Sequence, residues 1–168
     1  MSQILIISDS HYLRKNELHQ FFKQFPHCST IIHCGDIYPG YQPDEFDNFY
    51  ICKGNNDYVN LPRILSFTID HVRFTITHGH IKNYAYQPDS LLELLNDYPA
   101  DVICFGHTHI PYFQKTKDCI IINPGSLALG RSYPRQNTYA LFDTETKDIH
   151  FYDMKTKDEI ILENRQLS

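Results

Sequence analysis

The sequence lacks any apolar stretch that could cross a membrane. Its longest purely apolar runs, such as those at 4–7 and 119–122, are four residues long, whereas a transmembrane helix needs about 20. The first residues also lack the basic segment and long apolar core of a secretory signal. We therefore expect a cytoplasmic protein that does not associate with membranes.

An excess of positive charge and the common cysteine motifs are missing too. The net charge is −5, which argues against a stable complex with nucleic acid. The five cysteines include no C-x-x-C pair, so neither a zinc ribbon nor a thioredoxin-like motif is expected. G-x-x-x-x-G-K-[ST], G-x-G-x-x-G and H-E-x-x-H are absent as well, which excludes the usual nucleotide and zinc-protease motifs.

No linker or internal repeat divides the 168 residues, so we expect one domain over 1–168. Apolar runs and alternating patterns predict strands at 3–8, 30–34, 49–52, 64–69, 72–77, 101–105, 112–116, 119–123, 138–143 and 149–154. Leucines and phenylalanines at helical spacing predict helices over 13–25 and 88–95. The predicted fold class is α/β (α+β in some schemes), with two β-sheets packed face to face and helices outside.

Short polar clusters begin where five of the predicted strands end. They are Asp9-Ser-His11, Gly35-Asp36, Gly54-Asn-Asn-Asp57, His78-Gly-His80 and Gly106-His-Thr-His109. Ligands of layered α/β folds collect at the carboxyl ends of strands, so we expect these clusters to meet. The alternative, five ordinary turns, does not explain why five of the ten histidines fall within them.

The clusters offer carboxylate, imidazole and amide donors, a mixture that suits divalent transition ions. The candidate metal ligands are Asp9, His11, Asp36, Asn55, His78, His107 and His109. Side chains two residues apart share one face of an extended segment, as in Asp9 with His11 and in His107 with His109. Seven donors exceed the needs of one tetrahedral ion. They suit two ions that share a carboxylate, an arrangement used for phosphoryl transfer.

The order D-x-H, G-D, G-N-x-D, H-G-H and G-H-T-H resembles the calcineurin-like metallophosphoesterases. The short chain and the segment Asn123-Pro-Gly-Ser126 are similar to the small prokaryotic YfcE-type branch. The resemblance implies a four-layer α/β/β/α sandwich of two mixed β-sheets. It also implies a dinuclear site: Asp9, His11 and His109 would bind the first ion, and Asn55, His78 and His107 the second. Asp36 would bridge both ions.

The resemblance further implies a hydrolase of phosphodiesters, and of activated phosphomonoesters, that works by direct attack of a dimetal-bridging hydroxide on phosphorus. Manganese is the expected cofactor, and Zn, Fe, Ni or Co fit the same donors. The expected partner is a small phosphoester substrate. The sequence is compatible with a homodimer or a higher homo-oligomer, because Phe46, Phe49 and Phe113 suit either an interface or the core.

The predicted catalytic residues are Asp36, Asn55, His80 and Asp57. Larger members of the family carry a histidine, the proposed general acid, where this chain has Asn56, and an amide cannot act as a general acid at neutral pH. His80 is therefore a candidate acid or phosphate contact, or else a hydrogen-bond partner of another site residue. Asp57 either orients a neighbouring group or caps a turn.

The competing hypothesis is a binding scaffold that has kept the fold and lost the chemistry, as in a eukaryotic vesicle-sorting subunit that is similar to this family. All seven donor positions are filled, and a scaffold has no physical need to hold so many polar groups together. The enzyme is therefore favoured. Arg131 and Arg135 either contact a second phosphate or a nucleotide, or are solvated.

Overall fold

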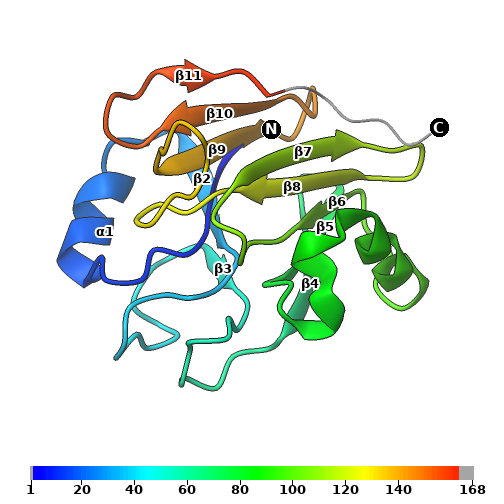
Figure 1. Ribbon diagram of the computed structural model, residues 1–168, viewed down its shortest axis with the longest axis horizontal. Coiled ribbons are helices and arrows are strands. Elements are labelled where there is room, and N and C mark those ends of the chain that lie inside the picture. The colour runs from blue at the N-terminus through cyan, green and yellow to red at the C-terminus, as the bar shows by residue number, and fades with distance from the viewer. Residues whose placement is uncertain (1, 163–168) are drawn as a thin grey trace.

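Two mixed β-sheets form the centre of the computed structural model, which describes residues 2–162 (Figure 1). The first sheet has the order β11 (Glu159–Ile160), β10 (Ile149–Asp153), β9 (Thr138–Asp143), β1 (Gln3–Ile7), β2 (Cys28–His33) and β3 (Phe49–Ile51). The second has the order β4 (Ile64–Ile69), β5 (Val72–Thr77), β6 (Val102–Cys104), β8 (Ile120–Pro124) and β7 (Pro111–Lys115). The predicted fold class is confirmed.

Most of the strands follow the predicted ranges to within two residues at either end. β4 and β5 form an antiparallel hairpin, with Asp70 and His71 at the turn in the left-handed region. The strand that was not predicted is β11, which pairs with β10. Its two residues are too few to show an alternating pattern, which explains why the sequence gives no sign of it.

The space between the sheets is filled by apolar side chains from both. Ile4 and Ile6 of β1 belong to one buried cluster with Phe74 and Ile76 of β5. The rings of Phe74 and Phe142 meet edge to face with centroids 5.6 Å apart. Removal of this apolar surface from water holds the two sheets together.

Helix α1 (Lys15–Phe22) covers the outer face of the first sheet, where Leu18 and Phe21 pack with Leu5 and Ile7. It is shorter than the predicted 13–25. The amide of Phe25 donates to the Phe22 carbonyl three residues back, so the chain tightens into turns after Phe22 and the α-helix ends there.

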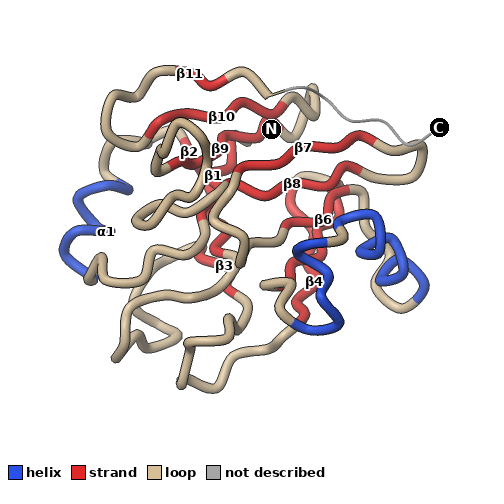
Figure 2. The backbone as a smooth tube through the Cα atoms, viewed as in Figure 1, coloured by secondary structure: helices blue, strands red, loops and turns tan. Residues whose placement is uncertain are grey.

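Two 3₁₀ helices, η1 (Ile81–Tyr86) and η2 (Pro88–Asn96), cover the outer face of the second sheet, so that helices flank both sheets (Figure 2). The helix predicted over 88–95 is present, but it is a 3₁₀ helix rather than an α-helix. With three residues per turn, Leu91 and Leu94 lie on the same side of η2, and both are buried against that sheet. η1 was not predicted.

All three of the phenylalanines considered for an interface are partly buried. Phe113 packs against the cluster between the sheets, and Phe46 and Phe49 pack against the cluster under α1, which supports core packing rather than an interface as their role. None of the helices formed by the described residues combines the length and apolarity that crossing a bilayer requires.

Candidate metal centre

The five polar clusters meet because the strands before them run parallel. β1, β2 and β3 are parallel in the first sheet, as are β5, β6 and β8 in the second. Parallel strands place their carboxyl ends at one edge of a sheet. The two edges are joined where the amide of His107 donates to Asp9 Oδ2 at 3.0 Å.

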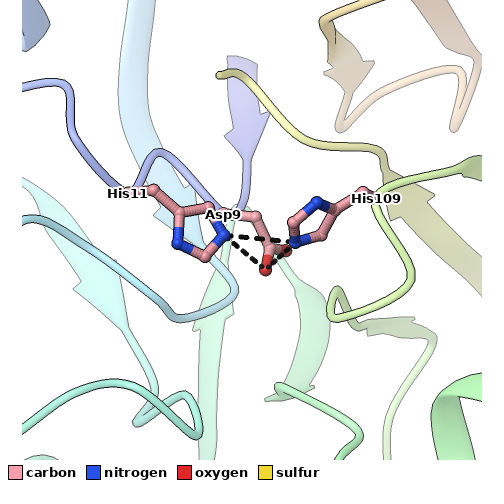
Figure 3. A group of neighbouring side chains, drawn as sticks. All are labelled: Asp9, His11 and His109. Atoms are coloured by element: carbon pink, nitrogen blue, oxygen red, sulfur yellow. Dashed lines mark hydrogen bonds and ion pairs between the residues drawn. The ribbon is translucent and has the colours of Figure 1, made fainter. Parts of the chain in front are cut away.

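The first group of donors comes from the loops after β1 and β6. Figure 3 shows Asp9, His11 and His109 pointing toward one another. His11 Nε2 lies 3.1 Å from His109 Nε2, and Asp9 Oδ1 lies 3.5 and 3.2 Å from these two nitrogens. Donors held about 2.0–2.2 Å from one ion are spaced in this way, so the three side chains can bind an ion together.

The second group comes from the loops after β1, β2, β3, β5 and β6. His78 Nε2 lies 3.3 Å from Asp36 Oδ2 and 3.7 Å from Asp9 Oδ1. His107 Nδ1 lies 3.3 Å from His78 Nε2 and 3.1 Å from Asn55 Oδ1. The structure therefore brings together all seven predicted ligands in two adjacent groups.

Two carboxylates lie between the groups. Asp9 belongs to both sets of mutually close donors, and Asp36 Oδ2 lies 4.0 Å from His11 Nε2 as well as 3.3 Å from His78 Nε2. Asp9 Oδ1 is buried and accepts no hydrogen bond of good geometry from the described residues. A buried carboxylate oxygen without a partner is costly, and an adjacent cation would remove that cost. The donor set thus fits a pair of divalent ions.

Backbone carbonyls orient two of the imidazoles. His78 Nδ1 donates to the Cys34 carbonyl at 2.7 Å, and His109 Nδ1 donates to the Leu129 carbonyl at 2.7 Å. A carbonyl can only accept, so in each neutral ring the proton sits on Nδ1. The Nε2 lone pair then faces the other donors, which is the arrangement that metal-binding histidines need.

The carboxylates also change the protonation of the site. Burial by itself would lower the pKa of His78, but contact with Asp36 and the charges of Asp9 and Asp36 raise that pKa to about 9. Burial would raise the pKa of Asp9, yet the imidazoles of His109 and His11 hold it well below its usual range. At neutral pH His78 is therefore an imidazolium, and a bound cation would take the place of its proton.

Several candidate ligands have an unusual backbone conformation. The angle φ is 50° at Asp9, 43° at His11, 64° at Asp36, 73° at His107 and 64° at His109. A non-glycine residue in such a region costs about 1–3 kcal/mol and persists only where its surroundings enforce it. Such strain concentrates at functional sites, which supports a binding role for this edge.

Two glycines allow the backbone to approach the acidic side chains. A Cβ at Gly54 would lie 2.1 Å from Asp36 Oδ1, and a Cβ at Gly106 would lie 2.1 Å from Ser8 Oγ and 2.7 Å from Asp9 Oδ2. These distances are shorter than any van der Waals contact. The G-N-x-D and G-H-T-H motifs therefore need glycine for close packing.

Asp57 supports the loop that carries Asp36. Its Oδ2 accepts hydrogen bonds from the amides of Asp36 and Gly54 at 2.9 and 2.7 Å, and its Oδ1 accepts from the amide of Ile37 at 3.0 Å. Asp57 is in neither donor group. Of the two roles considered for it, the contacts favour the orienting one.

His80 lies beside the second group, with its ring centroid 5.5 Å from that of His78 and 6.2 Å from that of His107. Its Nδ1 is buried and has no hydrogen-bond partner among residues 2–162. Burial, together with the charges of His78 and His107, lowers the pKa of His80. The ring is thus close to the candidate centre but is not one of its donors.

Sequence reasoning missed the hydrogen bonds that fix the orientation of two candidate ligands, Asp9 and Asp36. Asn56 donates from its backbone amide to Asp36 Oδ1 at 2.9 Å and from Nδ2 to Asp36 Oδ2 at 3.0 Å. Ser8 Oγ donates to Asp9 Oδ2 at 2.6 Å, and Ser126 Oγ donates to the Asp9 carbonyl at 2.7 Å. The position of these residues in or next to a motif was the available signal. The partners of Asn56 and Ser126 lie 20 and 117 residues away in the sequence, whereas Ser8 directly precedes its partner Asp9.

His33 links two of the site loops from inside the protein. Its Nδ1 accepts from the amide of Gly35 at 3.0 Å, and its Nε2 lies 2.8 Å from Ser10 Oγ. The side chain is fully buried, and burial lowers the pKa of His33 to about 3. It therefore stays neutral in the folded protein at pH values where it is charged in the unfolded chain.

We expect His33 to make the protein sensitive to mild acid. Between pH 3 and 6.5 the unfolded state binds a proton at His33 that the folded state does not. The stability that comes from burying the neutral His33 ring is therefore fully present above pH 6.5 and is lost as the pH falls from 6.5 toward 3. From pH 6 to pH 5 the free energy of unfolding should fall by about 1 kcal/mol more in the parent than in His33→Gln.

Urea unfolding at both pH values measures this difference. His71→Gln, at the exposed β4–β5 turn, is the matched control and should behave as the parent does. Equal pH dependence in the parent and His33→Gln would contradict the expectation.

Comparison with known proteins agrees with this geometry. A family model described as "Calcineurin-like phosphoesterase superfamily domain" matches residues 2–147. A Bacillus subtilis (strain 168) protein named "Probable metallophosphoesterase YsnB" is 31% identical over 166 residues, which cover 96% of this chain and 97% of that protein.

Two solved structures share the fold. A predicted phosphoesterase from Streptococcus pneumoniae TIGR4 has a TM-score of 0.81 at 21% identity, over 95% of this chain and 97% of that one. A structure described as a novel archaeal phosphodiesterase has a TM-score of 0.64 at 28% identity, over 95% of this chain and 99% of that one.

Proposed function

This chain belongs to the calcineurin-like phosphoesterase superfamily, and from that membership we propose that it is a metal-dependent phosphodiesterase. The observation that carries the proposal is the pair of adjacent donor groups with Asp9 and Asp36 between them. A relative described as a phosphodiesterase gives further support. Activated phosphomonoesters are the second substrate class that we expect.

The residues divide into two sets in this proposal. Asp9, His11 and His109 would hold one ion, and Asn55, His78 and His107 would hold the other. Asp36, which lies between the groups, would serve both. When bound, the two ions would lower the pKa of a water molecule and neutralise the charge of the phosphoryl oxygens. Manganese is the ion that we propose.

The protein's own side chains then fix the geometry of the reaction. Asp57 accepts from the backbone of the Asp36 loop, and the Asn56 backbone and side-chain amides donate to both Asp36 oxygens, which favours one orientation of the carboxylate. We propose that His80, whose ring lies beside the second group, contacts the phosphate or the leaving group. In-line attack of water on phosphorus in this fixed arrangement needs no covalent enzyme intermediate.

The test is an activity matrix on chelator-treated protein. Mn, Zn, Fe, Ni and Co are each added back and assayed with bis-nitrophenyl phosphate, nitrophenyl phosphate and alkyl esters. We expect hydrolysis only with added metal, and faster hydrolysis of the diester. Metal binding without stimulated hydrolysis of any ester would contradict the proposal and favour the binding scaffold.

The presence of Asn56 in place of a histidine leads to a further prediction, which concerns the leaving group of the ester. Without a histidine there, cleavage should depend strongly on leaving-group quality, so nitrophenyl esters should react much faster than alkyl esters. General acid catalysis is worth about 10²–10⁴-fold. Asn56→His should therefore raise the ratio of alkyl to nitrophenyl ester hydrolysis by about tenfold or more.

Asn56→Ala is the control, because it also removes the Nδ2 contact to Asp36 but introduces no acid. Its ratio of alkyl to nitrophenyl hydrolysis should equal that of the parent. The measured quantity is kcat/KM for each ester class. An equal effect of Asn56→His on both classes would show that the histidine does not protonate the leaving group.

A further inference from the structure

Large apolar side chains lie exposed next to the candidate metal ligands. Tyr12 follows His11, Ile110 follows His109, and both are exposed. Tyr86 is 57% exposed, and its ring meets that of His107 edge to face at 5.7 Å. An exposed group of large apolar side chains is a common mark of a ligand-binding surface.

One apolar pocket opens beside the second donor group. Its volume is about 240 Å³, and its lining includes Tyr86, Pro88, Phe105, Thr108, Ile110 and Tyr112. Thr108 lies between the candidate ligands His107 and His109 in the G-H-T-H loop. The pocket is therefore lined in part by the same loop that carries two of the candidate metal ligands.

The lining selects for an uncharged ring. None of the described residues that line the pocket carries a charge. The rings of Phe105 and Tyr112 meet edge to face at 6.0 Å, and edge-to-face contact is a preferred geometry between aromatic groups. Whole ligands occupy pockets of about 300–1,000 Å³, so this pocket suits part of a substrate, such as one ring.

We infer that this pocket is the subsite for an aromatic ring on one ester arm of the substrate. The inference rests on the proposed phosphoesterase function. Phosphorus lies at the metal centre while the ring, from an aryl alcohol or a nucleobase, packs against Tyr86 and the other side chains of the pocket. A charged arm, such as a second phosphate, finds no partner there.

Phosphonates test this inference without turnover, because their carbon–phosphorus bond is not hydrolysed. Methylphosphonate, benzylphosphonate and the phosphonate analogue of a nucleoside monophosphate are titrated calorimetrically into manganese-loaded protein. Stacking of one ring on aromatic side chains typically strengthens binding about tenfold or more. We therefore expect benzylphosphonate to bind about tenfold more tightly than methylphosphonate.

This tenfold preference should disappear in Tyr86→Ala and persist in Tyr86→Phe, which keeps the ring. Tyr133→Ala removes another exposed tyrosine, one that does not line the pocket, and should keep the preference. Tighter binding of the nucleoside analogue than of benzylphosphonate identifies a nucleobase as the natural ring, and weaker binding identifies an aryl ester.

Equal binding of benzylphosphonate and methylphosphonate to the parent would overturn the subsite. So would an unchanged preference in Tyr86→Ala. Failure of methylphosphonate itself to bind would count against the metal centre, and thus against the proposed function and the subsite together. The two failures are therefore distinguishable.

Discussion

Asp36→Asn should abolish metal-dependent phosphodiester hydrolysis, with kcat/KM for bis-nitrophenyl phosphate at least about 10³-fold below the parent. The substitution keeps the shape of the side chain but removes its negative charge. Asp36 Oδ2 is 3.3 Å from His78 Nε2 and 4.0 Å from His11 Nε2, so in the proposed function this oxygen would serve both ions. Loss of its charge should then weaken both binding positions at once.

The matched control is Asp118→Asn, which makes the same chemical change at an exposed turn between β7 and β8. It should hydrolyse the diester at the parental rate. Thermal melting of both variants in chelator shows whether each is folded. If folded Asp36→Asn hydrolyses as fast as the parent, the assignment of this edge as the catalytic centre is wrong.

Added divalent metal should stabilise the protein strongly. An ion at 100 times its Kd adds about 2.7 kcal/mol to the free energy of unfolding. For a chain of this length, that corresponds to a rise in Tm of roughly 5–10 °C per bound ion. The measurement is the Tm of chelator-treated protein with and without manganese or zinc.

Asp9→Asn should lose most of this rise in Tm, because Asp9 belongs to both donor groups. The amide can keep the hydrogen bonds from Ser8 and His107 at the second oxygen, so the variant should still fold. Asp118→Asn should keep the full rise. A full rise in Asp9→Asn would show that the ions bind elsewhere.

The stabilisation by metal should grow as the pH rises. The pKa of His78 is raised to about 9, so its favourable contribution to the metal-free protein is present below pH 6.5 and is lost as the pH rises through 9. A bound ion requires the neutral ring, so the apparent affinity should fall about tenfold per pH unit below 9. The rise in Tm should thus be larger at pH 8 than at pH 6.

Much of the fold was predictable because strands and polar clusters are local features. The apolar run before Asp9 and the run before Gly106 each gave a strand that ends where predicted to within two residues. The helices were less predictable, since η2 has a three-residue turn and η1 contains left-handed residues at Lys82 and Asn83. Such departures depend on packing against the sheet rather than on propensity.

The supporting contacts could not be predicted for a different reason. From the sequence, Asn56 is notable only because it replaces a histidine that could act as a general acid. In the structure, its backbone and side-chain amides donate hydrogen bonds to both oxygens of Asp36. The pocket at Tyr86 depends on how η1 lies over the G-H-T-H loop. Contacts across 20 or more residues leave no mark in a single sequence.

By itself, the sequence determined which donors this protein offers and that each stands at the end of a strand. Those facts follow from residue type and from the short-range pattern of apolar and polar positions. Only the tertiary structure decided which donors lie within 4 Å of one another, and that Asp9 and Asp36 stand between the two groups. Distances between loops depend on how two sheets pack, and packing is a property of the whole chain.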